Sequence, residues 1–288
     1  MNNTNTALHA LQEEYETFMN APDTRDDKPR VAAWGLVKAG KSSLLNMLSG
    51  HVTDEYFATG AIRTTRTNLE LETEQYVLID TPGLDAGDED TQEAYRGLDS
   101  ADVILFVHAP QGELDREEIG FLDQVVAEYG TETDQRLIMI LTQLDKNQGQ
   151  NIDMIKDRIL DQVEECAGIT PKCFLLSNTR YQKGATEHKN TLVEKSGIPA
   201  LAQHLKGLAY EIQPKLDFVR TQRLSAKKHS LLQRLDNAIE SEMALILEIQ
   251  HSYEKKTSRF NDIIQNLRDE YQSTEKEITS AKRKLTKL

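Results

Sequence analysis

The stretch Gly35-Leu-Val-Lys-Ala-Gly-Lys-Ser-Ser43 fits the phosphate-binding pattern G-x-x-x-x-G-K-[ST]. An apolar run over residues 31–34 precedes it and predicts a buried strand, and residues 43–48 predict the helix that follows. Glycines let the backbone amides of such a loop surround phosphate groups, and the N-terminus of the helix adds partial positive charge. The stretch therefore predicts an α/β domain that binds a nucleotide at the end of its first strand.

The residues of this loop have separate predicted roles. Lys41 reaches the outer phosphates of the nucleotide, and Ser42 offers its hydroxyl to a magnesium ion. The remaining predicted phosphate-binding residues of the loop are Gly35, Lys38, Ala39, Gly40 and Ser43.

A second phosphate-site motif, Asp80-Thr-Pro-Gly83, follows the apolar stretch at residues 76–79 and has the form D-x-x-G at a strand end. Asp80 can hold magnesium through water, and the amide of Gly83 can bind the terminal phosphate and respond to its loss. Between the two motifs lies Arg63-Thr-Thr-Arg66, before an alternating strand at residues 68–72. A threonine here completes the magnesium shell only while the terminal phosphate is present, and we assign this role to Thr65, with Thr64 as the alternative.

The base-reading element is predicted at Thr142-Gln-Leu-Asp145, after the apolar strand at residues 137–141. It resembles the [NT]-K-x-D element of GTPases, with Gln143 in place of the usual lysine. Asp145 would accept two hydrogen bonds from the guanine edge, which adenine cannot supply, and Thr142 would brace the neighbouring loops. A last strand at residues 173–176 ends in Ser177 and Asn178, where such proteins place a backbone amide near the base oxygen.

With these elements in order, the stretch from about residue 29 to residue 214 resembles a GTPase of the translation-factor-related class, most similar to its bacterial dynamin-like and Era/TrmE-like branches. The resemblance depends on Lys38-Ala39 in the first loop, on Thr64-Thr-Arg66, and on Asp80-Thr-Pro-Gly-Leu-Asp85. It implies a doubly wound, mostly parallel sheet with its ligand at the carboxyl ends of the strands. It also implies GTP as substrate, GDP as product and Mg²⁺ as cofactor.

One catalytic residue of this class is absent from its usual position. Ras-like enzymes carry a glutamine directly after D-x-x-G, where this chain has Leu84. Lys41, Thr65 and Gly83 are the predicted catalytic residues that remain. We hypothesise that the ammonium group of Lys38 stabilises charge near the bridging oxygen, or that Arg63 or Arg66 does so across a dimer. The alternative, that Lys38 is a solvated loop lysine and the protein a slow switch, stays open.

Composition limits the class of protein. The chain has 288 residues, 38% of them apolar, which is enough for one packed domain and an appendage. Two cysteines, Cys166 and Cys173, fit a reducing compartment, and no long apolar run or secretory pattern is present. We therefore expect a cytoplasmic protein, with peripheral membrane contact left open. The net charge of −13 argues against nucleic acid as the main ligand.

Residues 214–288 contain neither glycine nor any proline after Pro214, and they predict a helical tail with a heptad pattern. The apolar or small residues that recur at spacings of three and four are Tyr253, Thr257, Phe260, Ile264, Leu267, Tyr271, Thr274, Ile278, Ala281 and Leu285. Leu232, Leu235, Ile239, Met243 and Ile246 extend the pattern upstream, with one offset between Ile239 and Met243. The tail either breaks near His251-Ser252 and folds back, or forms a single rod of roughly 110 Å that pairs with another chain.

The predicted segments are an N-terminal helix and linker at residues 1–28, a GTPase domain at 29–213 and the helical tail at 214–288. Leu8, Leu11, Tyr15 and Phe18 repeat with helical spacing in the first segment. Two functions are consistent with these parts. The chain is either a dynamin-like GTPase whose nucleotide-dependent homodimerisation, through the GTPase domain or the tail, moves helical arms, or a GTP-controlled switch whose tail recruits a coiled-coil partner.

Overall fold

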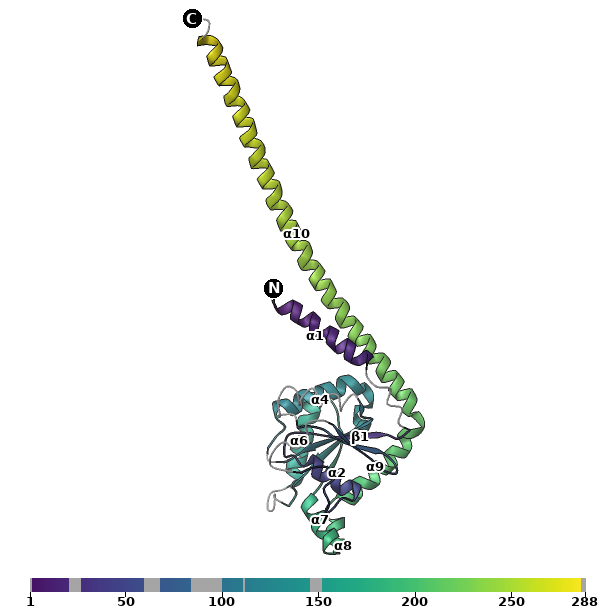
Figure 1. The fold of residues 1–288 in the computed structure, drawn as a ribbon. Helices are drawn as coiled ribbons and strands as arrows, with labels where there is room; N and C mark the ends of the chain where they lie inside the picture. Colours follow the sequence, from purple (N-terminus) through teal and green to yellow (C-terminus); the bar gives the residue numbers. More distant parts are fainter. Residues whose placement is uncertain are drawn as a thin grey trace. The chain divides into compact units, whose positions relative to one another are not determined.

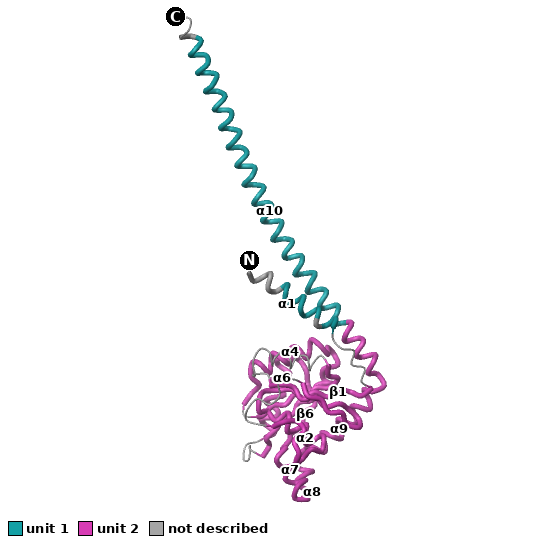
Figure 2. The backbone as a smooth tube through the Cα atoms, viewed as in Figure 1, with its two compact units in different colours: residues 1–22, 226–288 teal, residues 23–225 magenta. Residues whose placement is uncertain are grey.

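The computed structural model describes residues 2–20, 27–59, 68–83, 100–110, 112–145 and 152–285. Its contacts divide the chain into two compact units (Figure 2). One unit is residues 23–225, and the other combines residues 1–22 with residues 226–288. The predicted segments 1–28, 29–213 and 214–288 stay a prediction, because contact units do not test which parts fold independently.

The larger unit is built on a sheet whose described strands have the order β2-β3-β1-β4-β5-β6. The strands are β1 (Arg30–Trp34), β2 (Leu69–Glu72), β3 (Val77–Asp80), β4 (Val103–His108), β5 (Leu137–Leu141) and β6 (Lys172–Leu175). Only the pairing of β2 with β3 is antiparallel among them, and the other four pairings are parallel. The predicted doubly wound, mostly parallel sheet is confirmed.

Helices cover both faces of this sheet (Figure 1). Alternate residues of a strand point to opposite faces, so Ala33 of β1 belongs to one apolar cluster and Trp34 to the other. The first cluster includes α2 (Lys41–Ser49) and α9 (Ile198–Ile212), and the second includes α4 (Arg116–Tyr129) and α6 (Ile152–Ala167). Shorter helices complete this unit: α5 (Thr133–Arg136), α7 (Asn178–Thr186), α8 (Asn190–Glu194) and the 3₁₀ turns Gly130–Glu132 and Gln213–Lys215.

The tail is one continuous helix, α10 (Leu216–Leu285), of 70 residues. The break considered at His251-Ser252 is therefore wrong, because helical hydrogen bonding continues through both residues and no glycine or proline interrupts them. At 1.5 Å per residue the helix is about 105 Å long. None of the described helices has the length and apolar character that crossing a membrane requires.

The predicted N-terminal helix is also confirmed, as α1 (Asn2–Met19). It belongs to the same unit as the part of α10 from Ala226 onward (Figure 2), and an ion pair joins the two helices. Arg234 Nη2 lies 3.0 Å from Glu14 Oε2. Both side chains are largely exposed, so this pair adds little stability.

The first turns of α10, residues 216–225, belong to the sheet-containing unit and form hydrogen bonds with the residues just before β4. Arg220 donates from Nε and Nη2 to the two carboxylate oxygens of Asp102, at 3.1 and 2.5 Å. Asp102 is 1% exposed and also accepts a hydrogen bond from the backbone amide of Arg30. Arg223 donates to the carbonyl of Ala101 and lies over the ring of Tyr129.

Candidate nucleotide-binding site

The phosphate loop joins β1 to α2 and needs glycine at its first position. Gly35 has φ +149°, and a Cβ added to it would lie 2.0 Å from the carbonyl oxygen of Val107 in β4. Gly40 has φ +103° and directly precedes α2. The loop therefore lies against the end of the neighbouring strand, a close approach that a side chain would prevent.

Lys41 and Ser43 lie in the first turn of α2. The Lys41 side chain is buried against the loop, and Nζ donates to the carbonyl oxygens of Gly35 at 2.9 Å and Leu36 at 3.0 Å. These bonds hold an ammonium group over the concave loop, in a position to meet an anionic phosphate. Lys38, by contrast, is exposed and has φ +64°.

Ser42 and Asp80, both predicted to serve the metal, are brought together. Ser42 Oγ donates to Asp80 Oδ2 at 2.7 Å, and Asp80, the last residue of β3, is 1% exposed. A hydroxyl and a carboxylate are hard oxygen ligands, so this pair fits a magnesium ion. When bound, such an ion neutralises charge on the phosphate oxygens.

The backbone of Gly83 lies against the phosphate loop. A Cβ added to Gly83 would lie 2.4 Å from Val37 Cγ2 and 2.8 Å from Val37 N. The D-x-x-G motif thus brings the backbone of Gly83 beside the phosphate loop, and its contact with the terminal phosphate stays a prediction. The switch candidates Arg63, Thr64, Thr65 and Arg66, and also Leu84, lie outside the described residues.

The predicted base-reading carboxylate is held by two hydroxyl groups. Ser177 Oγ donates to Asp145 Oδ1 at 2.6 Å, and Thr179 Oγ1 donates to Oδ2 at 3.0 Å. Burial opposes ionisation of this carboxyl, but the hydrogen bonds from Ser177 and Thr179 outweigh it and keep the pKa of Asp145 below its ordinary value. Asp145 is therefore a fixed anionic acceptor at neutral pH.

Side chains from the base-reading region donate to three consecutive carbonyl oxygens of the phosphate loop. The pairs are Gln143 Nε2 to Lys38 O at 3.3 Å, Thr142 Oγ1 to Ala39 O at 2.6 Å, and Asn178 Nδ2 to Gly40 O at 3.3 Å. Carbonyl and amide groups of one peptide unit point in opposite directions, so these bonds orient the loop amides away from the base-reading region. The bracing predicted for Thr142 is extended by Gln143 and Asn178, whose part in it the sequence did not indicate.

Sequence reasoning also missed a buried pair at the end of β4. His108 Nδ1 lies 2.8 Å from Glu118 Oε1, with the two side chains 5% and 1% exposed, and His108 Nε2 lies 3.2 Å from the carbonyl oxygen of Gly112. Glu118 also forms a capping box with Asp115 at the start of α4. The only sequence signal was the acidic start of this helix.

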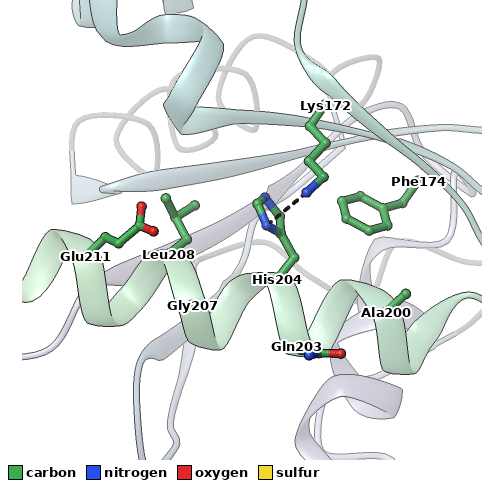
Figure 3. A pocket seen from close by; sticks show the side chains of 8 residues that line it. All are labelled: Lys172, Phe174, Ala200, Gln203, His204, Gly207, Leu208 and Glu211. Carbon is green, nitrogen blue, oxygen red and sulfur yellow. Dashed lines mark hydrogen bonds between the residues drawn. The ribbon is translucent and has the colours of Figure 1, made fainter.

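A groove of about 410 Å³ lies elsewhere in the same unit, between β6 and α9 (Figure 3). Lys172 and Phe174 approach His204 across it, with Lys172 Nζ 3.3 Å from His204 Nδ1. Burial and the adjacent ammonium group lower the pKa of His204. None of the predicted nucleotide-binding residues lines this groove.

Comparisons with known proteins agree with this geometry. Residues 30–143 match the family model described as "50S ribosome-binding GTPase". An uncharacterized protein of Acinetobacter baylyi is 32% identical over 72% of this chain and 48% of its own length. The tRNA modification GTPase MnmE of Salinibacter ruber is 36% identical over 37% of this chain and 24% of its own length. Toc33 of Arabidopsis thaliana, solved with GDP and Mg²⁺, has a TM-score of 0.50 and 16% identity, with 71% of this chain and 93% of Toc33 covered.

The family match, the parallel sheet and the phosphate loop agree with one another: residues 30–143 are similar to the P-loop GTPase domains of the translation-factor-related class. Within this class it is similar to the bacterial GTPases MnmE, Der and Era. The chain spans about half of the length of the Acinetobacter protein and about a quarter of MnmE. These relatives therefore share only part of their length with this chain.

Proposed function

We propose that this protein binds GTP with Mg²⁺ and hydrolyses it to GDP and phosphate, and that nucleotide-dependent association changes the state of its helical tail. The observation that supports this most is the set of hydrogen bonds from Gln143, Thr142 and Asn178 to the phosphate loop. Through them, a guanine recognised by Asp145 would be positioned relative to phosphates held by the loop. Base recognition and phosphate binding are thereby coupled.

Preference for guanine is proposed from the acceptor character of Asp145. Its two oxygens already accept from Ser177 and Thr179, and each retains a lone pair for a donor on the base. Guanine presents adjacent N–H groups to such a carboxylate, whereas adenine presents no such pair. We expect Asp145→Asn to weaken GTP binding by about 100-fold, since a charge-assisted bidentate contact is lost.

Binding of mant-labelled GTP and ATP, followed by fluorescence titration, would measure this preference. Glu113→Gln is the matched control, because it makes the same chemical change in an exposed ion pair with Arg158. Xanthosine triphosphate is an informative third nucleotide, since its C2 carbonyl would accept from the new amide of Asp145→Asn. Equal affinity for ATP and GTP in the unmodified protein would contradict the guanine assignment.

Phosphate chemistry is assigned to residues of the loop and of the D-x-x-G motif. Lys41 neutralises charge on the outer phosphates, Ser42 and Asp80 hold the metal, and the Gly83 amide contacts the terminal phosphate. Thr65, with Thr64 as the alternative, completes the metal shell in the GTP state. Lys38, Arg63 or Arg66 is the proposed source of positive charge at the bridging oxygen, because Leu84 offers no polar group.

Association is proposed as the step that completes catalysis, and GTP turnover per molecule tests it. The hydrolysis rate should be measured over a wide range of protein concentration, with ATP as control nucleotide. Specific activity that rises with concentration supports a dimeric catalytic site. Slow turnover independent of concentration would favour the second candidate, a GTP-controlled switch that recruits a coiled-coil partner.

The second candidate has its own support in the exposed apolar side chains of α10, which a partner helix could cover. Location in the cytoplasm, peripheral membrane contact and the lack of a nucleic-acid ligand remain predictions from the sequence. Flotation with anionic liposomes, in GDP and in a non-hydrolysable GTP analogue, tests the membrane contact. Recovery of the protein in the liposome-free fraction with both nucleotides would exclude it.

A further inference from the structure

The part of α10 between residues 243 and 281 exposes large apolar side chains along one face. Tyr253 is 72% exposed, Phe260 62% and Tyr271 71%. Met243, Ile246, Leu267 and Ile278 on the same face are each more than half exposed. We call residues 243–281 the apolar seam. A helix that exposes so much apolar surface in regular spacing is expected to be covered by another helix.

The heptad positions of the seam follow from its spacing of three and four. Positions a and d are, in order, Met243, Ile246, Gln250, Tyr253, Thr257, Phe260, Ile264, Leu267, Tyr271, Thr274, Ile278 and Ala281. A straight α-helix drifts by about 20° per heptad relative to this repeat, so the pattern requires a left-handed supercoil with a partner. The charged residues at positions e and g then decide the identity and direction of that partner.

Charge complementarity selects a second copy of this chain in the antiparallel direction. We align two antiparallel helices so that Asp262 of one copy is level with Asp262 of the other, and call this point the crossing point. In this alignment position e of one helix faces position e of the other, and g faces g. Lys256 then faces Glu270 of the other copy, and Glu254 faces Arg268. Each pair occurs twice because of the twofold symmetry. Glu240 and Lys282, just outside the seam, form a further opposite-charge pair in the same alignment.

The same alignment matches the core layers. Phe260 meets Ile264 of the other copy, and Tyr253 meets Tyr271. Three of the residues at a and d are polar, and two of them, Gln250 and Thr274, meet each other, while Thr257 meets Leu267. A buried polar position disfavours other registers, because it would be placed against apolar groups there.

Other arrangements of two copies bring like charges together. In a parallel, in-register pair Glu270 faces Glu275 of the other helix. Shifting the antiparallel pair by one heptad in one direction places Glu254 against Glu275, and in the other direction Glu240 against Glu275. The alignment that crosses at Asp262 has none of these repulsive pairs.

We propose that the apolar seams of two copies of this chain form an antiparallel coiled coil that crosses at Asp262. The biological consequence of this dimer rests on the proposed function, since it would set the distance and orientation between two GTPase domains. Its formation requires no nucleotide. The dimer is therefore tested without nucleotide, and GTP binding is measured separately on the same variants.

Charge reversal tests the facing pairs in the full chain. Lys256→Glu and Glu270→Lys each turn two attractive pairs into repulsive ones, and each is expected to raise the dimer dissociation constant about tenfold at low ionic strength. The double variant Lys256→Glu/Glu270→Lys restores opposite charges and should return the constant to within about twofold of the original. Lys255→Glu is the matched control, because Lys255 is next to Lys256 in the chain but occupies position f, which faces away from the partner.

Sedimentation equilibrium gives these constants, and Glu270→Lys separates the two directions most sharply. In a parallel dimer this change would remove the repulsion from Glu275 and strengthen association, which would overturn the proposal. A monomer at all concentrations would also overturn it and leave the seam to a different partner. Loss of GTP binding with an intact dimer would instead remove the proposed function and leave this inference standing.

A distance measurement checks direction independently of charge. A spin label at Ser280, in a background of Cys166→Ser and Cys173→Ser, lies 18 residues from the crossing point at Asp262. Two such labels would be about 54 Å apart in the antiparallel dimer and within about 20 Å in a parallel one. Pulsed electron spin resonance resolves these values, and the shorter distance would exclude the antiparallel arrangement.

Discussion

One helix, α10, has a region whose side chains are buried against its own chain and a region whose apolar side chains are exposed. In its first turns, residues 216–225, Leu216 is 4% exposed and Arg220 and Arg223 are bound by buried groups of the sheet-containing unit. In the apolar seam, residues 243–281, Phe260 is 62% exposed. Both regions are free of glycine and proline, so helix propensity does not distinguish them. The difference teaches that a continuous helix can be stabilised by its own chain at one end and require a partner further on.

The largest expected effect comes from removing the carboxylate that binds the first turns. Asp102→Ala leaves the Arg220 guanidinium, 14% exposed, without its carboxylate and removes the acceptor for the Arg30 amide. We expect a loss of about 3–5 kcal/mol in the free energy of unfolding. Trp34, the single tryptophan of the chain and buried in β1, reports this unfolding by fluorescence in urea.

Glu72→Ala is the control for this change, because it removes a carboxylate whose ion pair with Lys28 is exposed. Its cost should stay below about 1 kcal/mol. Equal losses for the two variants would mean that the first turns of α10 are not held by the Asp102 pair.

The contact between Asp102 and Arg220 also shows which parts of the fold the sequence predicts and which it does not. The strand predicted at residues 137–141 is β5 with the same bounds, since a run of five apolar residues indicates a buried parallel strand. The phosphate loop followed from its pattern. The Asp102–Arg220 pair joins residues 118 positions apart and depends on where α10 begins relative to the sheet. Local periodicity carries no information about such a pairing.

The site shows the same limit. Ser42 and Asp80 could be paired from motifs, because each motif has a known place at the strand ends. Asn178 can donate to Gly40 because the carboxyl ends of β6 and β1 lie at the same end of the sheet. The order of the strands that brings them there is a property of the whole fold. From the sequence, Gln143 is predicted only to replace the usual lysine beside the base. Its hydrogen bond to Lys38 O depends on the backbone conformation of Gln143, which has φ +57°, and the sequence does not indicate this conformation.

A second prediction compares two apolar truncations in α10. Leu216→Ala removes a side chain from the core cluster shared with α9 and should cost about 2–4 kcal/mol of unfolding free energy. Phe260→Ala, measured at a concentration too low for association, should change the same quantity by less than about 0.5 kcal/mol. Urea titration with Trp34 fluorescence measures both. A large loss for Phe260→Ala in the dilute protein would show that the seam is already covered within one chain.

A third prediction compares arginines from the two contact units. Arg223 donates to Ala101 O and lies 5.3 Å from the centre of the Tyr129 ring, and Arg223→Lys keeps the charge but loses the planar group that makes both contacts. We expect a cost of about 1 kcal/mol. Arg234→Lys is the matched control, because its pair with Glu14 is exposed, and it should change stability by less than about 0.5 kcal/mol. Thermal unfolding of both variants in one buffer provides the comparison, and equal midpoints would contradict it.

The smallest expected effect is on the pH dependence of stability in the sheet-containing unit, which includes the first turns of α10. Burial and the Lys172 ammonium lower the pKa of His204 below its ordinary value of 6.5. The unfolded chain therefore takes up a proton at His204 more readily than the folded one, and this residue reduces stability as pH falls below about 6.5. His204→Gln should lose less stability between pH 8 and pH 5 than the unmodified protein. His251→Gln, at an exposed position in the apolar seam, is the matched control. A pH profile for His204→Gln that coincides with that of the unmodified protein would mean that protonation of the groove does not affect folding, and the two regions of the molecule would then not differ in their response to acid.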